Sequence, residues 1–179
     1  NIQGGGQNSR YGISAGFDRS NDELVGNGQK RYTISFKNDN KFFDGKLNLS
    51  TGLYLVKSNF TNNALNPLTL SMQAAGNERL YPYAALADSE GNPIPINHEY
   101  RRSFILDAQG QGLLDWQFRP LQEISERDYR TNSTDVRLNL GLDYALHKNL
   151  NLNVSYQYWQ NDSERNQLNS ADSYFSRNL

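Results

Sequence analysis

Residues 133–159 read STDVRLNLGLDYALHKNLNLNVSYQYW, and their pattern indicates the fold class. From Val136 to Leu146 the even positions are apolar, while Arg, Asn, Gly, Asp and Ala stand between them. The alternation stops at His147 and Lys148 and resumes through Tyr158. A period of two places successive side chains on opposite faces of a β-strand. The stretch therefore predicts a tight β-hairpin with one apolar and one polar face.

The same alternation occurs earlier in the chain and predicts an all-β fold. Five strands are expected, at residues 9–18, 31–40, 46–58, 133–146 and 149–160. Each is about 9 to 11 residues or slightly longer, the length that a tilted strand needs to cross a bilayer. The connections alternate between short turns and longer loops, of which residues 61–130 form the longest. Short periplasmic turns and long extracellular loops are typical of outer-membrane barrels.

The two faces predict two environments. Leucine and valine side chains in mid-strand are expected to face lipid, whereas Asn, Asp and Arg suit a hydrated lumen. The expected lipid-facing residues are Leu138, Leu140, Leu142, Leu152 and Val154. Aromatic residues gather near the strand ends, as in the interfacial girdles of barrels; they are Tyr11, Tyr32, Tyr144, Tyr156, Tyr158 and Trp159. The alternative is a secreted soluble β-sandwich or glycan-binding module, in which the leucines pack against a second sheet.

Composition excludes several other classes of protein. Hydrophobic residues make up 36% of the 179 residues and aromatic residues 12%, and the mean hydropathy is −0.79. The 23 asparagines are compatible with a wet polar face. The net charge of −1 provides no basic footprint, so no nucleic-acid partner is expected. The chain has no cysteine, which excludes disulfides and thiol catalysis.

No catalytic, metal or cofactor site is expected. His98 and His147 are the only imidazoles, and neither stands among converging acid or nucleophile groups. Asp88 and Glu90 are the nearest approach to a calcium site, and they are too few. The glycine-rich stretches lack the Lys-Ser/Thr of a phosphate-binding loop. The sequence therefore does not predict an enzyme.

Motifs in the longest loop resemble a known family. They are LYPYAALADSEGNPIPI at residues 80–96, YRRSF at 100–104 and GLLDWQFRPLQEI at 112–124, followed by the strand sequence DVRLN at 135–139. Together and in this order they resemble SusC/RagA-type TonB-linked outer-membrane proteins of Bacteroidetes.

The resemblance implies a fold, a location and partners. Members of this family are transporters with barrels of about 22 strands, a plug domain and a TonB box, and five strands cannot close such a barrel. We therefore expect these 179 residues to be part of the barrel, with the plug domain and TonB box outside them. The implied function is uptake of oligosaccharides or oligopeptides across the bacterial outer membrane, driven by TonB–ExbBD. The implied partner is a SusD-like surface lipoprotein, and a barrel without transport activity is a further alternative.

Aromatic residues of the longest loop are the candidate contact residues. With two neighbouring charged residues they are Tyr81, Tyr83, Tyr100, Asp115, Trp116, Phe118 and Arg119. The aromatic rings could pack the loop, contact a protein partner or stack on a sugar ring. Asp115 and Arg119 flank Trp116 and are expected to form an ion pair.

Overall fold

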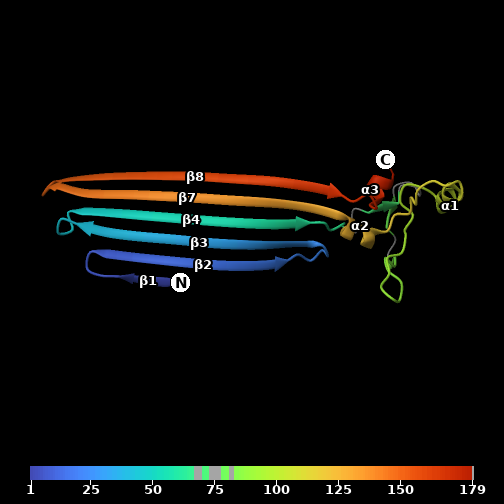
Figure 1. Cartoon of the computed structure of the whole chain (residues 1–179), viewed down its shortest axis with the longest axis horizontal. Helices are drawn as coiled ribbons and strands as arrows, with labels where there is room; N and C mark the ends of the chain where they lie inside the picture. Colours follow the sequence, from blue (N-terminus) through green and yellow to red (C-terminus); the bar gives the residue numbers. More distant parts are fainter. Residues whose placement is uncertain (67–69, 73–77, 81–82, 179) are drawn as a thin grey trace. The chain divides into compact units, whose positions relative to one another are not determined.

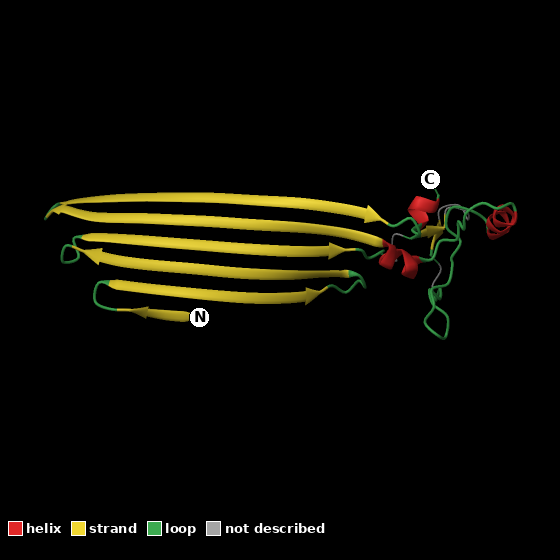
Figure 2. Cartoon of the chain, viewed as in Figure 1, coloured by secondary structure: helices red, strands yellow, loops and turns green. Residues whose placement is uncertain are grey.

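Six hydrogen-bonded strands form one sheet in the computed structural model, which describes residues 1–66, 70–72, 78–80 and 83–178 (Figures 1 and 2). Their order in the sheet is β1-β2-β3-β4-β7-β8. The bounds are β1 Ile2–Gly5, β2 Ser9–Asn21, β3 Asn27–Phe42, β4 Leu47–Asn62, β7 Arg127–His147 and β8 Leu150–Asn169. The predicted all-β class is therefore confirmed.

The strands are longer than the alternation predicts. β3 and β4 each contain 16 residues, β7 contains 21 and β8 contains 20. The additional residues are mostly polar on both faces, as in the QNDSERNQLN end of β8. They extend the strands because pairing depends on backbone hydrogen bonds, which polar side chains allow equally well. β1, which pairs with β2 from Ile2 opposite Ile13 to Gly5 opposite Arg10, was not predicted.

Side-chain contacts show that the polar residues of neighbouring strands share a face. On this polar face Ser14 Oγ lies 2.7 Å from Ser35 Oγ. Farther across the sheet, Asn153 Nδ2 donates to Asp143 Oδ1 at 2.5 Å. Alternation places the leucines on the other face, where the rings of Phe17 and Tyr32 are 5.0 Å apart.

Two compact units make up the chain. The strand unit comprises Asn1–Ser20, Gln29–Phe60 and Thr131–Arg165, all of which the structure describes. Its only buried residue is Ser58, so none of its apolar side chains is buried. Leu140, Leu152 and Val154 are 37%, 44% and 52% exposed.

The loop unit comprises Asn21–Gly28, Thr61–Arg130 and Asn166–Leu179. It contains the two-stranded sheet of β5 (Ser71–Met72) and β6 (Glu78–Arg79), and the helices α1 (Arg102–Gly110), α2 (Pro120–Glu126) and α3 (Tyr174–Arg177). Its hydrophobic core is formed by Leu70, Ile96, Phe118 and Tyr174, with Leu65, Leu80 and Leu86 packed against it. The loop unit therefore has a hydrophobic core, to which residues 61–130 and the segment after β8 both contribute.

Short turns connect the neighbouring strands at one end of the strand unit. In the strand unit the connections are short, at residues 6–8, 43–46 and 148–149. Phe43, Asp44 and Gly45 have φ values of 53°, 54° and 82°, and glycine is the residue that adopts such a conformation at least cost. Among the described residues, no helix is both long and apolar enough to cross a membrane.

Candidate functional site: an aromatic stack on the loop unit

Three aromatic rings gather in the loop unit. The ring centroids of Tyr100 and Trp116 are 5.6 Å apart, those of Tyr100 and Phe104 are 5.5 Å apart, and those of Phe104 and Trp116 are 6.2 Å apart. We call these three residues the aromatic stack. Separations of 4.5 to 7 Å between ring centroids are the range in which aromatic pairs attract each other.

The position of Trp116 in the stack is fixed by its polar edge. The indole Nε1 donates to the backbone carbonyl of Arg177 at 2.8 Å. The Arg177 side chain lies 3.7 Å from Asp115 Oδ2, and its Nε donates to the carbonyl of Ser173 at 3.3 Å. The end of the described chain thus holds the segment around Trp116, although about 60 residues separate them in sequence.

The expected Asp115–Arg119 ion pair is present. Arg119 Nη1 lies 2.8 Å from Asp115 Oδ2, and Arg119 Nη2 donates to Gln117 Oε1 at 2.9 Å. Asp115 Oδ1 also accepts the backbone N–H of Gln117 at 2.9 Å. These bonds close a turn around Trp116, so both charged residues support the stack.

The remaining candidate residues take different places. Phe118 is only 5% exposed and packs against Tyr174 and His98, with ring centroids 5.1 and 4.5 Å away. Phe118 therefore contributes to the core. Tyr83 is fully exposed and has a φ of 66°, whereas Tyr81 lies outside the described residues.

Several apolar side chains of the stack and of the segment between α1 and Trp116 are exposed. Phe104 is 51% exposed, and Leu113 and Leu114, which follow α1, are 51% and 62% exposed. An open depression of about 530 Å³ lies beside Tyr100 and Phe104. Its other lining residues are Glu99, Arg101, Ser103 and Asp107. Apolar rings beside charged groups provide the surface of a protein-protein contact or a sugar-binding subsite.

Phe104 lies in the YRRSF motif but was not among the predicted contact residues. Tyr100 precedes α1, which begins at Arg102, so helical spacing does not link it to Phe104 and no local pattern predicts their contact.

The loop unit also contains a buried carboxylate. Glu123 in α2 is 1% exposed, and its Oε1 accepts the backbone N–H of Tyr174 at 2.5 Å. Arg177 Nη2 is 4.0 Å from the same oxygen, while Oε2 has no hydrogen-bond partner among the described residues. Burial raises the pKa of Glu123, which the Tyr174 N–H and the nearby Arg127 and Arg177 partly oppose.

Asp88 has a structural role in a turn. Its carboxylate accepts the backbone N–H groups of Glu90 and Asn92 at 2.9 and 2.8 Å, and the Asn92 side chain at 3.0 Å. These hydrogen bonds, with the Asn92 side chain first, lower the pKa of Asp88. Among the described residues no three potential metal ligands gather.

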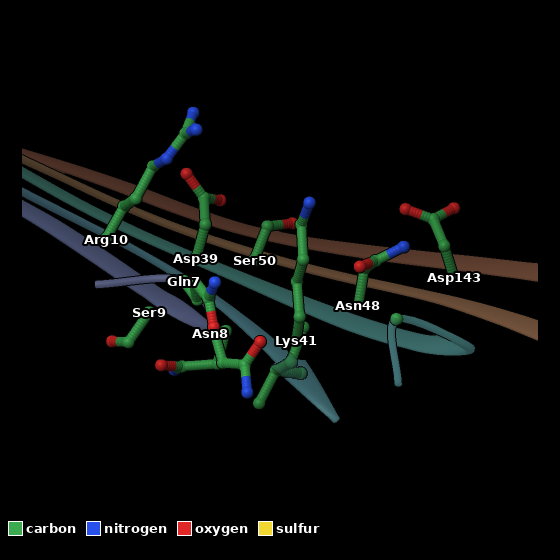
Figure 3. Close-up of a pocket in the computed structure, with 12 residues that line it drawn as sticks. Gln7, Asn8, Ser9, Arg10, Asp39, Lys41, Asn48, Ser50 and Asp143 are labelled. Carbon is green, nitrogen blue, oxygen red and sulfur yellow. The ribbon is translucent and has the colours of Figure 1, made fainter. Parts of the chain in front are cut away.

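A second hollow lies on the polar face of the strand unit. Figure 3 shows Arg10, Asp39, Asn48, Ser50 and Asp143 projecting from neighbouring strands to one side. The hollow has a volume of about 400 Å³. Its lining carries both acidic and basic groups, which suits a hydrated surface more than a site for one strongly charged ligand.

The comparisons with known proteins add no relative. A scan against protein-family models finds no match, and a search of curated proteins finds none either.

Proposed function

We propose that this chain forms part of the wall and one extracellular loop of a large outer-membrane β-barrel. The barrel would import oligosaccharides or oligopeptides in a TonB-dependent manner, together with a SusD-like surface lipoprotein. In this proposal the apolar face contacts lipid, the polar face borders the lumen, and the loop unit faces the cell exterior. The role is uptake, without catalysis and without a cofactor.

The observation that carries the proposal is a long sheet with no core on either face. Burying a leucine or valine side chain is worth about 1.5 to 3 kcal/mol, and Leu140, Leu152 and Val154 remain exposed. Lipid would cover such a face without a second protein layer. A polar opposite face then follows, because the lumen of a large barrel is hydrated.

Strand length agrees with this arrangement. A strand of 20 residues, such as β8, extends for about 66 Å. Tilted by about 45°, it rises by roughly 47 Å, more than the hydrocarbon core of about 30 Å. The apolar alternation covers only residues 150–158 of β8, and the polar remainder follows it. We infer that this remainder projects beyond the lipid on the side of the longest loop.

The soluble sandwich remains the competing hypothesis, and it requires a second sheet over Leu138, Leu140, Leu152 and Val154. The strand unit, described throughout, forms a single layer and buries none of these side chains. This favours the barrel over the sandwich.

The aromatic stack and its surroundings provide a surface for the lipoprotein. Phe104, Leu113 and Leu114 expose apolar area, and Tyr and Trp are the residue types enriched at binding hot spots. Because hydrogen bonds within the loop unit hold Trp116 in place, little ordering would be needed on binding.

Purification of the full-length protein from outer membranes in mild detergent tests the proposal. We expect it to require detergent and to carry a surface lipoprotein with it, identified by mass spectrometry. A Phe104→Ser and Leu114→Ser double variant should lose the lipoprotein but stay in the membrane. Replacing Ser20 and Gln29 by alanine, in the strand unit, provides a matched control. A protein that stays soluble and monomeric without detergent would contradict the barrel and support the sandwich.

A further inference from the structure

One tryptophan lies on the polar face of the sheet, where the surrounding residues are hydrophilic. Trp159 is in β8, one position after Tyr158, and alternation places it on the face opposite that tyrosine. Its indole Nε1 donates to Asp135 Oδ2, on β7, at 2.7 Å. The expectation that Trp159 joins an interfacial girdle with Tyr156 and Tyr158 is therefore wrong, because its contacts are those of the polar face.

The ring of Trp159 is held in place but not covered. Arg137 Nε lies 2.9 Å from Asp135 Oδ1, and the Arg137 guanidinium carbon is 5.9 Å from the centre of the indole ring. Asp135 is therefore shared between an indole and a guanidinium, and its side chain is only 15% exposed. Trp159 itself is 61% exposed on β8, which is an edge strand of this sheet.

An exposed and oriented indole is not explained by packing. No apolar side chain in the strand unit is buried, so Trp159 joins no core. The indole N–H already has an acceptor, so the flat apolar face of the ring is the part that can contact a ligand. Such a platform suits a ligand that combines an apolar face with a polar rim.

We propose that Trp159, Asp135 and Arg137 form a subsite for a pyranose ring of a neutral oligosaccharide. The C–H groups of one sugar face stack on the indole, and the hydroxyl groups at the ring edge hydrogen-bond to the Asp135 carboxylate and the Arg137 guanidinium. Because these two charges offset each other, the subsite has no net charge to pair with a peptide terminus. The inference rests on the proposed import function and selects glycan over peptide.

The neighbouring residues extend the subsite along the strands. Asn161 Nδ2 donates to Ser133 Oγ at 3.4 Å, one step along β8 on the same face. Trp159 is ten residues beyond the turn at 148–149, about 33 Å along the strand. With the tilt of about 45° expected in the proposed barrel, this is roughly 23 Å above the turn, in the outer half of a hydrocarbon layer of about 30 Å, and a glycan entering the lumen would pass it.

Fluorine NMR on the full-length protein tests the subsite directly. The protein is labelled with 5-fluorotryptophan in detergent micelles, and the Trp159 resonance is assigned by its absence from Trp159→Phe. The probes are hexasaccharides of glucose, xylose, mannose and galactose, with hexa-alanine as the peptide. We expect at least one hexasaccharide, and not the peptide, to shift this resonance.

Variants link that signal to affinity. For the hexasaccharide that shifts the resonance, Trp159→Ala should weaken binding about tenfold, which corresponds to about 1.4 kcal/mol. Trp159→Phe should retain most of the affinity because it keeps a ring. Tyr158→Ala removes an adjacent ring from the opposite face and should leave binding unchanged. Equal losses for Trp159→Ala and Tyr158→Ala would overturn the subsite.

Uptake by cells separates this inference from the proposed function. If the cells import hexa-alanine while no hexasaccharide shifts the resonance, the subsite is overturned and the importer stands. If the cells take up neither class of probe through the wild-type protein, the import function fails.

Discussion

Replacing Leu140 by arginine tests the proposal that the leucine face of the sheet meets lipid. Leu140 precedes His147, the last residue of β7, by seven positions, or about 23 Å along the strand. In a barrel whose strands tilt by about 45°, it would lie roughly 16 Å above the turn, near the middle of a hydrocarbon layer of about 30 Å. In the proposed barrel its side chain, 37% exposed in this chain, points into lipid.

An arginine at this depth is costly because its charge leaves water. The penalty at the bilayer midplane is about 2 to 4 kcal/mol, or a factor of roughly 30 to 900 in the folding equilibrium. Asn139→Arg is the matched control, because it places the same charge one position away on the polar face. We expect Leu140→Arg to lose that free energy and Asn139→Arg to lose little.

Reversible guanidinium unfolding of the full-length protein in phospholipid vesicles measures the difference. The fraction of each variant recovered in the outer membrane of cells provides a second reading. Equal stability and equal recovery of the two variants would refute the assignment of faces. A larger loss of stability for Asn139→Arg would mean that the polar face is the packed one. A barrel with a hydrated lumen would then be excluded.

Other predictions concern the loop unit. Phe118→Ala removes a core ring and should destabilise the unit by about 3 to 5 kcal/mol, measured by amide hydrogen exchange, whereas Tyr83→Ala should not. Burial raises the pKa of Glu123 above its ordinary value of 4.5, so the folded unit binds the proton more tightly than the unfolded chain. The stability of the unit should therefore fall as the pH rises from about 4.5 through the raised pKa. Glu123→Gln should remove this pH dependence, measured by hydrogen exchange at several pH values. Asp115→Asn weakens a partly exposed ion pair and should cost at most about 1 kcal/mol in the same assay; a larger cost would contradict its supporting role.

The alternation predicted the strands because it reports directly on backbone geometry. Residues 136–144 alternate between apolar and other residues at every position, and β7 contains all of them. The polar ends of β7 and β8 show no alternation, so their pairing could not be predicted from side chains. That pairing depends on hydrogen bonds to the backbone of the neighbouring strand, and a local sequence pattern does not predict them.

The contact residues were harder to predict, since aromatic residues suit both cores and surfaces. Phe118 and Trp116 stand two positions apart in the same motif, yet one is buried and the other joins the aromatic stack. The difference depends on Tyr174 and Arg177, which are more than 50 residues away. For Trp159 the alternation did contain the answer, because its odd position belongs to the polar face. The general preference of tryptophan for membrane interfaces led to the wrong placement.

The segment after β8 explains how the longest loop can present a fixed surface. Tyr174 fills the core beside Phe118, its hydroxyl donates to Glu99 Oε2 at 2.7 Å, and the Arg177 carbonyl accepts the Trp116 indole. These contacts join the segment after β8 to the longest loop, so the loop unit is held together by contacts within the chain itself. Loop closure restricts the motions that would otherwise oppose binding. If the loop unit is extracellular, as we propose, it would hold its aromatic stack ready for the lipoprotein. Tyr174→Ala should then weaken that complex, although Tyr174 lies in the core.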